Sequence, residues 1–193
     1  MFGVHRHLTS ALNSFRPDGP PPDAPDVAPF MQALCVKGII VQTLELKVPP
    51  VILVLVTASL MWTLAAVVPS LGFTLFSSSL VALVLAVIGV AFALLGVWEF
   101  RTAGTTVDPR VPDQSVSLVV RGVYRVSRNP MYVGFFLVLF ALGIFLSNLA
   151  SLVLLPAFVI YMNRFQIVPE ERHMREKFGE TYRQYEAEVR RWF

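Results

Sequence analysis

The chain has 193 residues, of which 55% are hydrophobic and only 15% are charged, and its mean hydropathy is +0.62. Soluble domains are usually about one-quarter charged, so this composition indicates a membrane protein. The net charge of +3 does not indicate nucleic-acid binding, because the basic residues flank apolar segments and form no separate basic domain.

The cysteine and histidine content excludes two further classes of site. Cys35 is the single cysteine, so an internal disulfide framework is excluded. The histidines His5, His7 and His173 are not spaced with carboxylates or thiols as metal ligands are, so no metal site is predicted.

The N-terminal region is expected to lie outside the membrane. Residues 16–29 are rich in proline and aspartate and have almost nothing to bury, which predicts a disordered or polyproline-like lead. Residues 30–47 mix apolar and charged positions. This segment fits either a short interfacial helix or a loosely ordered approach to the first span.

Four apolar segments are predicted to cross the bilayer: residues 51–68, 80–98, 131–146 and 149–165. The first would extend about 27 Å as a helix, close to the thickness of the hydrocarbon core. Turns are expected at residues 69–79 and at Ser147 and Asn148, and Pro156 should kink the last span unless its neighbours accommodate it. The predicted fold class is therefore all-α, an integral membrane bundle of about four transmembrane helices.

The second span carries small residues on one helical face. They are Ala82, Ala86, Gly89, Ala93 and Gly96, spaced alternately four and three residues apart. In membranes such a stripe lets a second helix approach closely, so it predicts helix packing.

Charge distribution predicts the topology. Every lysine and arginine precedes residue 51, lies within residues 101–128, or follows residue 163. Four crossings place all of these on one side of the membrane, and the positive-inside rule makes that side cytoplasmic, with both termini. Residues 121–134 and the C-terminal tail are then expected to face the same compartment.

The tail is predicted to form an amphipathic cytoplasmic helix. Its apolar positions recur at helical spacing and comprise Met174, Phe178, Tyr182, Tyr185, Val189 and Trp192. Gly179 is expected to divide it into two pieces.

Two polar stretches are candidates for chemistry: residues 121–134, which read RGVYRVSRNPMYVG, and residues 169–173, which read PEERH. Each also has an ordinary structural explanation. Acidic residues favour a helix N-terminus, arginines anchor helix ends, and Asn129 with Pro130 fits an N-cap followed by a first-turn proline. The residue types alone leave both interpretations open.

The pattern G-x-Y-x-x-x-R-N-P-x-Y-x-G resembles a motif of the isoprenylcysteine carboxyl methyltransferase family and its phospholipid methyltransferase relatives. The tail P-E-E-R, followed by F-G-x-x-Y-x-x-Y and R-W, resembles that family's second signature. The resemblance covers roughly residues 44–193, which we take as the membrane methyltransferase domain, and residues 1–43 look like an extension.

The resemblance implies an integral-membrane enzyme that binds S-adenosylmethionine in a cytoplasm-facing pocket. The implied cofactor-binding residues are Gly122, Tyr124, Arg128, Asn129, Pro130, Tyr132, Gly134, Glu170 and Glu171. Arg128 is expected to pair with the cofactor's carboxylate, and Glu170 or Glu171 to accept from its ammonium or ribose hydroxyls. Arg128 and Glu171 are the predicted catalytic residues.

The acceptor is expected to be lipophilic and to arrive from the bilayer, as in isoprenylcysteine methylation. The family's motif commonly has histidine where this chain has Asn129, whose amide forms hydrogen bonds but takes up no proton. The acceptor is therefore left open among a carboxylate, an amine, a thiol and a phenol. An amine or phenol requires a base, for which Glu171 or His173 is the nearest candidate.

Two alternatives to a methyltransferase remain. One is a membrane reductase of related architecture that binds a nicotinamide cofactor in a similar pocket. The other is a non-enzymatic membrane subunit whose basic face docks a partner. The sequence predicts contact with the lipid bilayer and with a methyl acceptor, but it predicts no oligomeric state.

Overall fold

The computed structural model describes residues 45–75, 78–103 and 118–193, all within one unit, Ile40–Phe193. The predicted extension at residues 1–43 lies outside the described residues. The described residues form helices and no strand apart from an isolated bridge between Gly72 and Asn148, which confirms the all-α fold class.

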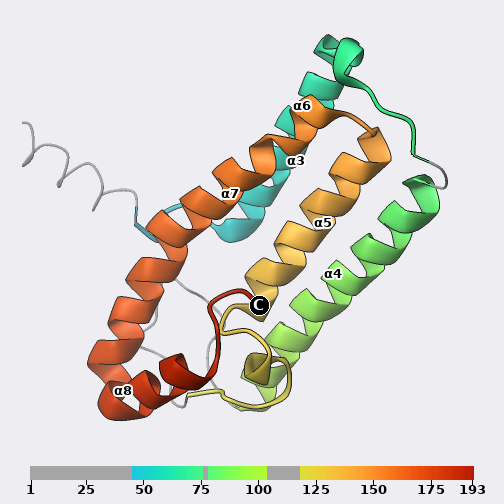
Figure 1. The fold of residues 1–193 in the computed structure, drawn as a ribbon. Helices are drawn as coiled ribbons and strands as arrows, with labels where there is room; N and C mark the ends of the chain where they lie inside the picture. Colours follow the sequence, from blue (N-terminus) through green and yellow to red (C-terminus); the bar gives the residue numbers. More distant parts are fainter. Residues whose placement is uncertain (1–44, 76–77, 104–117) are drawn as a thin grey trace, which may run out of the picture. The chain divides into compact units, whose positions relative to one another are not determined.

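The helices of the membrane bundle are shown in Figure 1. They are α3 (Pro50–Val67), α4 (Ser78–Thr102), α5 (Pro130–Leu146), α6 (Leu149–Leu152) and α7 (Leu154–Met162), with short 3-10 turns η1 (Pro69–Leu71) and η3 (Gly122–Arg125). A π-helical turn, η4 (Asn163–Ile167), joins α7 directly to α8 (Val168–Glu188). Three stretches of the described chain are long and apolar enough to cross a membrane, namely α3, α4 and the continuous run Leu149–Glu188, and α5 is a shorter apolar helix.

The last helical run differs from the prediction in its continuity. The predicted span ends at residue 165, but the helix continues through η4 into α8, whose many charged residues place it beyond the apolar part. The expected irregularity near Pro156 occurs at Val153, which separates α6 from α7. Pro156 has no backbone N–H group, so it cannot donate to the carbonyl four residues before it. Gly179 has φ +54° and breaks α8, as predicted.

The hairpin between α5 and α6 is closed by Asn148. Ser147 ends α5 in the left-handed conformation, with φ +48°. The Asn148 Oδ1 accepts from the backbone N–H groups of Ala150 and Ser151 at 2.9 and 3.3 Å, which caps α6. Its Nδ2 donates to the Val68 carbonyl at 2.9 Å, so one side chain ties the predicted turn to the end of α3.

Helices α4 and α5 pack backbone to backbone. A Cβ added at Gly89 would lie 2.8 Å from the Gly134 carbonyl oxygen, and one at Gly134 would overlap the Gly89 carbonyl oxygen and Ala93. A Cβ added at Gly96 would lie 2.8 Å from Met131 Cγ. The small-residue stripe therefore forms the α4–α5 interface, as predicted.

The buried core lies on the opposite side of α5, against α3 and α7. Its members are Met61, Tyr132, Leu139, Leu155, Phe158, Met162 and Ile167. The outer faces of α3 and α4 remain apolar and open: Leu55 is 62% exposed and Leu94 is 63% exposed. A helix that is apolar all round belongs in lipid, which agrees with a membrane bundle.

The α4–α5 contact gives a test of the bundle. Gly89→Val should lower the free energy of unfolding by about 1–3 kcal/mol or more, because its side chain must push apart two backbones. The measurement is the Tm of the purified protein in detergent. Val87→Leu, at a position 60% exposed on the same helix, is the matched control and should leave the Tm unchanged. Equal Tm values for the two variants would show that α4 and α5 do not pack as described.

Candidate active site

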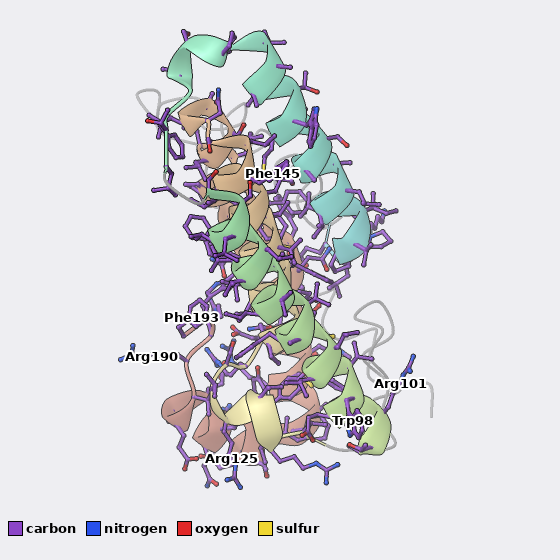
Figure 2. All side chains as sticks on the ribbon, turned by 90° about the vertical axis from the view of Figure 1, so that its right-hand side faces the viewer. Trp98, Arg101, Arg125, Phe145, Arg190 and Phe193 are labelled. Atoms are coloured by element: carbon purple, nitrogen blue, oxygen red, sulfur yellow. The ribbon has the colours of Figure 1, made fainter. Side chains whose placement is uncertain are left out.

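The two predicted polar stretches meet at one end of the bundle, where α4 ends and α5 begins. Figure 1 shows η3 and α8 at this end. In Figure 2 the labelled side chains of Arg101, Arg125 and Arg190 point outward at the same end, and Phe145 lies towards the other. The site is therefore built from segments that are distant in the sequence.

The segment η3 is attached to the end of α4 through Glu99. The Arg121 Nε donates to Glu99 Oε2 at 2.9 Å, and an Arg121 Nη2 donates to Thr102 Oγ1 at 2.8 Å. Gly122 has φ +57°, and a Cβ there would overlap the Glu99 carboxylate. The positive φ favours glycine at this position, and any side chain there would also displace the Glu99 carboxylate, which explains the first residue of the motif.

Glu171 is a buried carboxylate surrounded by arginines. It is 3% exposed and receives the Arg191 Nε at 2.9 Å and the Arg191 Nη2 at 2.5 Å. The Nη2 of Arg128 lies 3.3 Å from Glu171 Oε1, and the Nη2 of Arg175 lies 3.6 Å from Glu171 Oε2. A buried carboxylate needs such partners, so these contacts compensate for the burial of Glu171.

Arg128 also binds a second carboxylate, that of Glu186. Its Nη1 donates to Glu186 Oε1 at 2.6 Å. Arg175 donates to the same carboxylate through two nitrogens at 2.7 and 2.8 Å, and this hydrogen bonding is the main reason that the pKa of Glu186 is lowered. Arg128 thus joins two carboxylates, both from α8, in one ionic cluster.

The last five residues, 189–193, form what we call the C-terminal strap. Its Arg190 carbonyl accepts from the Arg128 backbone N–H at 3.0 Å. Its Arg191 carbonyl accepts from Ser127 Oγ at 3.2 Å and from Asn129 Nδ2 at 3.0 Å. The strap therefore lies directly against the first motif.

The strap is also fixed at Trp192, whose Nε1 donates to Asn163 Oδ1 at 3.0 Å. The indole ring lies edge-on to Phe136, with centroids 6.4 Å apart.

Asn129 begins α5 in the N-cap position, as predicted, but its side chain holds the strap and makes no cap hydrogen bond.

Glu170 has a different environment from Glu171. The Tyr132 hydroxyl donates to Glu170 Oε1 at 2.5 Å. Although the residue as a whole is half-buried, its carboxyl group is enclosed. Burial raises the pKa of Glu170 to about 8; the Tyr132 hydrogen bond opposes this, and the negative charge of Glu171 adds to it.

Two buried polar atoms in the site have no hydrogen-bond partner among the described residues: Tyr124 Oη and Arg128 Nε. Tyr124 is 4% exposed, lies edge-on to Phe100 at 5.2 Å, and its carbonyl accepts from the Tyr185 hydroxyl at 2.7 Å. Burial is the main cause of the raised pKa of Tyr124, followed by Tyr185, Glu170 and Glu99. An unpartnered buried polar atom costs about 1–3 kcal/mol, so such atoms mark where a ligand or water fits.

The predicted residues do not all have the same surroundings. Arg128, Asn129 and Glu171 are connected directly or through the strap, and Tyr132 and Glu170 form a separate contact between the two motifs. Pro130 is buried at the start of α5 and lies against Gly96, whereas Gly134 lies in the interface with α4. Gly134 therefore positions the motif and does not line the polar cluster.

Sequence reasoning missed Glu186, Ser127 and Asn163. Glu186 stands among other charged residues of an amphipathic helix, and nothing in the local pattern distinguishes it. The R-W pair of the tail is a usable signal for the strap, but where the strap binds depends on the fold.

An apolar groove of about 490 Å³ lies between α4 and α5, away from the polar cluster. Its lining residues are Ser79, Ala82, Leu83, Ala86, Val138, Ala141, Leu142 and Phe145. These residues belong to the start of α4 and the end of α5, so the groove is separate from the candidate active site.

Comparison with known proteins identifies the family. The model of the phospholipid methyltransferase family matches residues 77–181, which include the first motif and the P-E-E-R and F-G parts of the second. The chain is also 39% identical over 62 residues to an uncharacterised protein of Haemophilus influenzae, a match covering 32% of this chain and 98% of that protein. No solved structure matches the chain significantly. Because the family match covers more than half of the chain, the protein belongs to the phospholipid methyltransferase family and is a membrane methyltransferase.

Proposed function

We propose that the protein transfers a methyl group from S-adenosylmethionine to a lipophilic acceptor that arrives from the bilayer. The main supporting observation is that Arg128 of the first motif contacts Glu171 of the second, at 3.3 Å. Beside them, Tyr132 and Glu170 form a second contact between the same two motifs. The site thus combines cationic and anionic groups with aromatic hydroxyls at the membrane surface.

The residues present fit the methyl donor. The donor carries a cationic sulfonium, an ammonium and a carboxylate, and when bound it supplies an electrophilic methyl group. Glu170 and Glu171 suit its cationic groups, and Arg128 suits its carboxylate. The unpartnered Tyr124 Oη and Arg128 Nε leave hydrogen-bonding capacity for its polar atoms.

Arg128 and Glu171 bind each other and their neighbours in this structure. For Arg128 to pair with the donor carboxylate it must exchange part of its contact with Glu171 or Glu186. This exchange keeps each charge compensated, so the ionic cluster acts as a preformed site in which the ligand replaces a protein partner.

We place the site on the cytoplasmic side of the membrane, with both termini. In support, Arg101, Arg125 and Arg190 gather at the site end (Figure 2), and no lysine or arginine occurs in the connections at the other end. The donor would then enter from the cytoplasm, and the acceptor, isoprenylcysteine-like in being lipophilic, would enter between the helices.

The donor assignment is tested by thermal stabilisation of the purified protein. S-adenosylmethionine should raise the Tm in a concentration-dependent manner, because a ligand that binds only the folded state stabilises it. The reduced nicotinamide cofactors NADH and NADPH serve as the comparison. Stabilisation by a nicotinamide cofactor alone would indicate a reductase, and stabilisation by neither would favour a non-enzymatic subunit. Membranes incubated with methyl-labelled donor, with and without the protein, should yield a labelled lipophilic product.

The site assignment is tested with Arg128→Ala and Glu171→Ala. Each should weaken S-adenosylmethionine binding at least tenfold by calorimetry, since a charge-assisted hydrogen bond contributes about 1.5–3 kcal/mol. Arg128→Lys should also bind weakly, because an ammonium lacks the planar fork that reaches two carboxylates.

The matched controls are Arg125→Ala, at an exposed position of the same motif, and Glu180→Ala, which has an exposed ion pair with Arg183. Both controls should bind like the wild type. Wild-type affinity in Arg128→Ala and Glu171→Ala would remove these residues from the donor site.

A further inference from the structure

We propose that Glu170, held by Tyr132, is the proton acceptor of the methyl transfer, and that the acceptor group is an N–H or O–H nucleophile of a lipophilic molecule. This inference rests on the proposed function. It assigns different tasks to two carboxylates that are adjacent in the sequence.

Glu171 is unsuited to accept a proton. Both of its oxygens receive guanidinium N–H groups from Arg191, and Arg128 and Arg175 lie within 3.6 Å. Both oxygens therefore already accept charge-assisted hydrogen bonds, which an acceptor's N–H or O–H group would have to displace. We therefore assign Glu171 to the ionic cluster and to the donor's cationic groups, and not to proton transfer.

Glu170 lacks this compensation. Among the described residues no arginine or lysine forms an ion pair with it, and its hydrogen-bond donor is the Tyr132 hydroxyl at 2.5 Å. The charged or titratable groups that face it are Glu171 on its own helix, Tyr132 on α5 and Tyr124 on η3. A carboxyl group in such surroundings takes up and releases its proton near neutral pH, as a general base requires.

Tyr124 gives the second geometric observation. Its hydroxyl is buried and has no partner in the described part of the chain, and the negative charge of Glu170 is one cause of the raised pKa of Tyr124. This hydroxyl is available to hold the heteroatom of an incoming acceptor. The acceptor's own N–H or O–H group would then point to the Glu170 carboxylate.

The proton and electrons balance as follows. The acceptor's lone pair forms the bond to the methyl carbon, the electron pair of the carbon–sulfur bond leaves with sulfur, and the acceptor's proton passes to the ionised Glu170 carboxylate. A carboxylate acceptor has no proton to give up and would leave Glu170 without a role. The nature of the acceptor and the need for Glu170 are therefore linked.

The experiment uses the full-length protein in phosphatidylcholine nanodiscs, methyl-labelled S-adenosylmethionine, and three probes of similar apolar length: dodecylamine, 4-octylphenol and dodecanoate. The wild type should methylate the amine or the phenol but not dodecanoate. With 4-octylphenol, whose hydroxyl keeps its proton over this range, its kcat/KM should fall about tenfold per pH unit below the pKa of Glu170, because only the ionised carboxylate accepts the proton.

Glu170→Gln retains an oxygen for the Tyr132 hydroxyl and should fold normally. It should still bind S-adenosylmethionine, less tightly than the wild type because one carboxylate that faces the donor's cationic groups is lost. At saturating donor it should lower kcat by roughly 10²–10⁴-fold and, with 4-octylphenol, lose the slope of the pH profile. Tyr132→Phe should move the profile to higher pH, since the Tyr132 hydrogen bond lowers the pKa of Glu170. Glu176→Gln, exposed on the same helix, should change neither rate nor profile.

Three outcomes would overturn the inference. They are a wild-type pH profile in Glu170→Gln, methylation of dodecanoate alone, and a protein that binds the donor but methylates neither the amine nor the phenol. Absence of donor binding in the wild type would instead contradict the proposed function, so the two failures are distinguishable. Calorimetry in two buffers with different heats of ionisation measures the protons released when the donor binds, and this readout does not depend on activity. Donor binding near pH 7 should release protons from the wild type and not from Glu170→Gln.

Discussion

Glu171 brings a negative charge into a site that water hardly reaches, and the arrangement around it follows from that constraint. Its partners come from three places: Arg128 precedes α5, Arg175 lies on α8, and Arg191 lies in the C-terminal strap. A buried carboxylate without such partners would be strongly destabilising. The tail must therefore fold back onto the first motif, and this places the strap backbone against Ser127 and Asn129.

The membrane bundle provides the platform for this cluster. Lipid is as apolar as the helices, so burial of hydrophobic surface does not draw α4 and α5 together. Close packing at Gly89 and Gly134 does so instead, and it brings Glu99 at the end of α4 next to Gly122. The same helix pair thus fixes η3 and, with it, Tyr124. The two glycines of the motif serve the backbone geometry of the site.

Two neighbouring carboxylates acquire different chemistry because of what surrounds them. Glu171 is compensated by guanidinium groups, whereas Glu170 is bonded to a tyrosine hydroxyl and has a pKa raised by burial. Enzymes often separate acid–base tasks in this way, through environment and not through residue type. Because the protein belongs to the phospholipid methyltransferase family, we propose that this contrast divides the tasks of methyl transfer between the two carboxylates.

The sequence by itself determined the all-α membrane fold, the approximate spans, the break at Gly179 and the stripe of small residues. Each of these depends on local periodicity or on the conformational properties of glycine and proline. It also identified the two motifs, because their residue patterns resemble two signatures of a methyltransferase family, although the residue types alone fit ordinary helix ends. The pairing of side chains was decided only by the tertiary structure. Glu186 looks like any charged residue of an amphipathic helix, and the bond of Asn129 to the strap joins residues 62 positions apart. The different surroundings of Glu170 and Glu171 likewise depend on which segments fold against each carboxylate, and no local pattern encodes that.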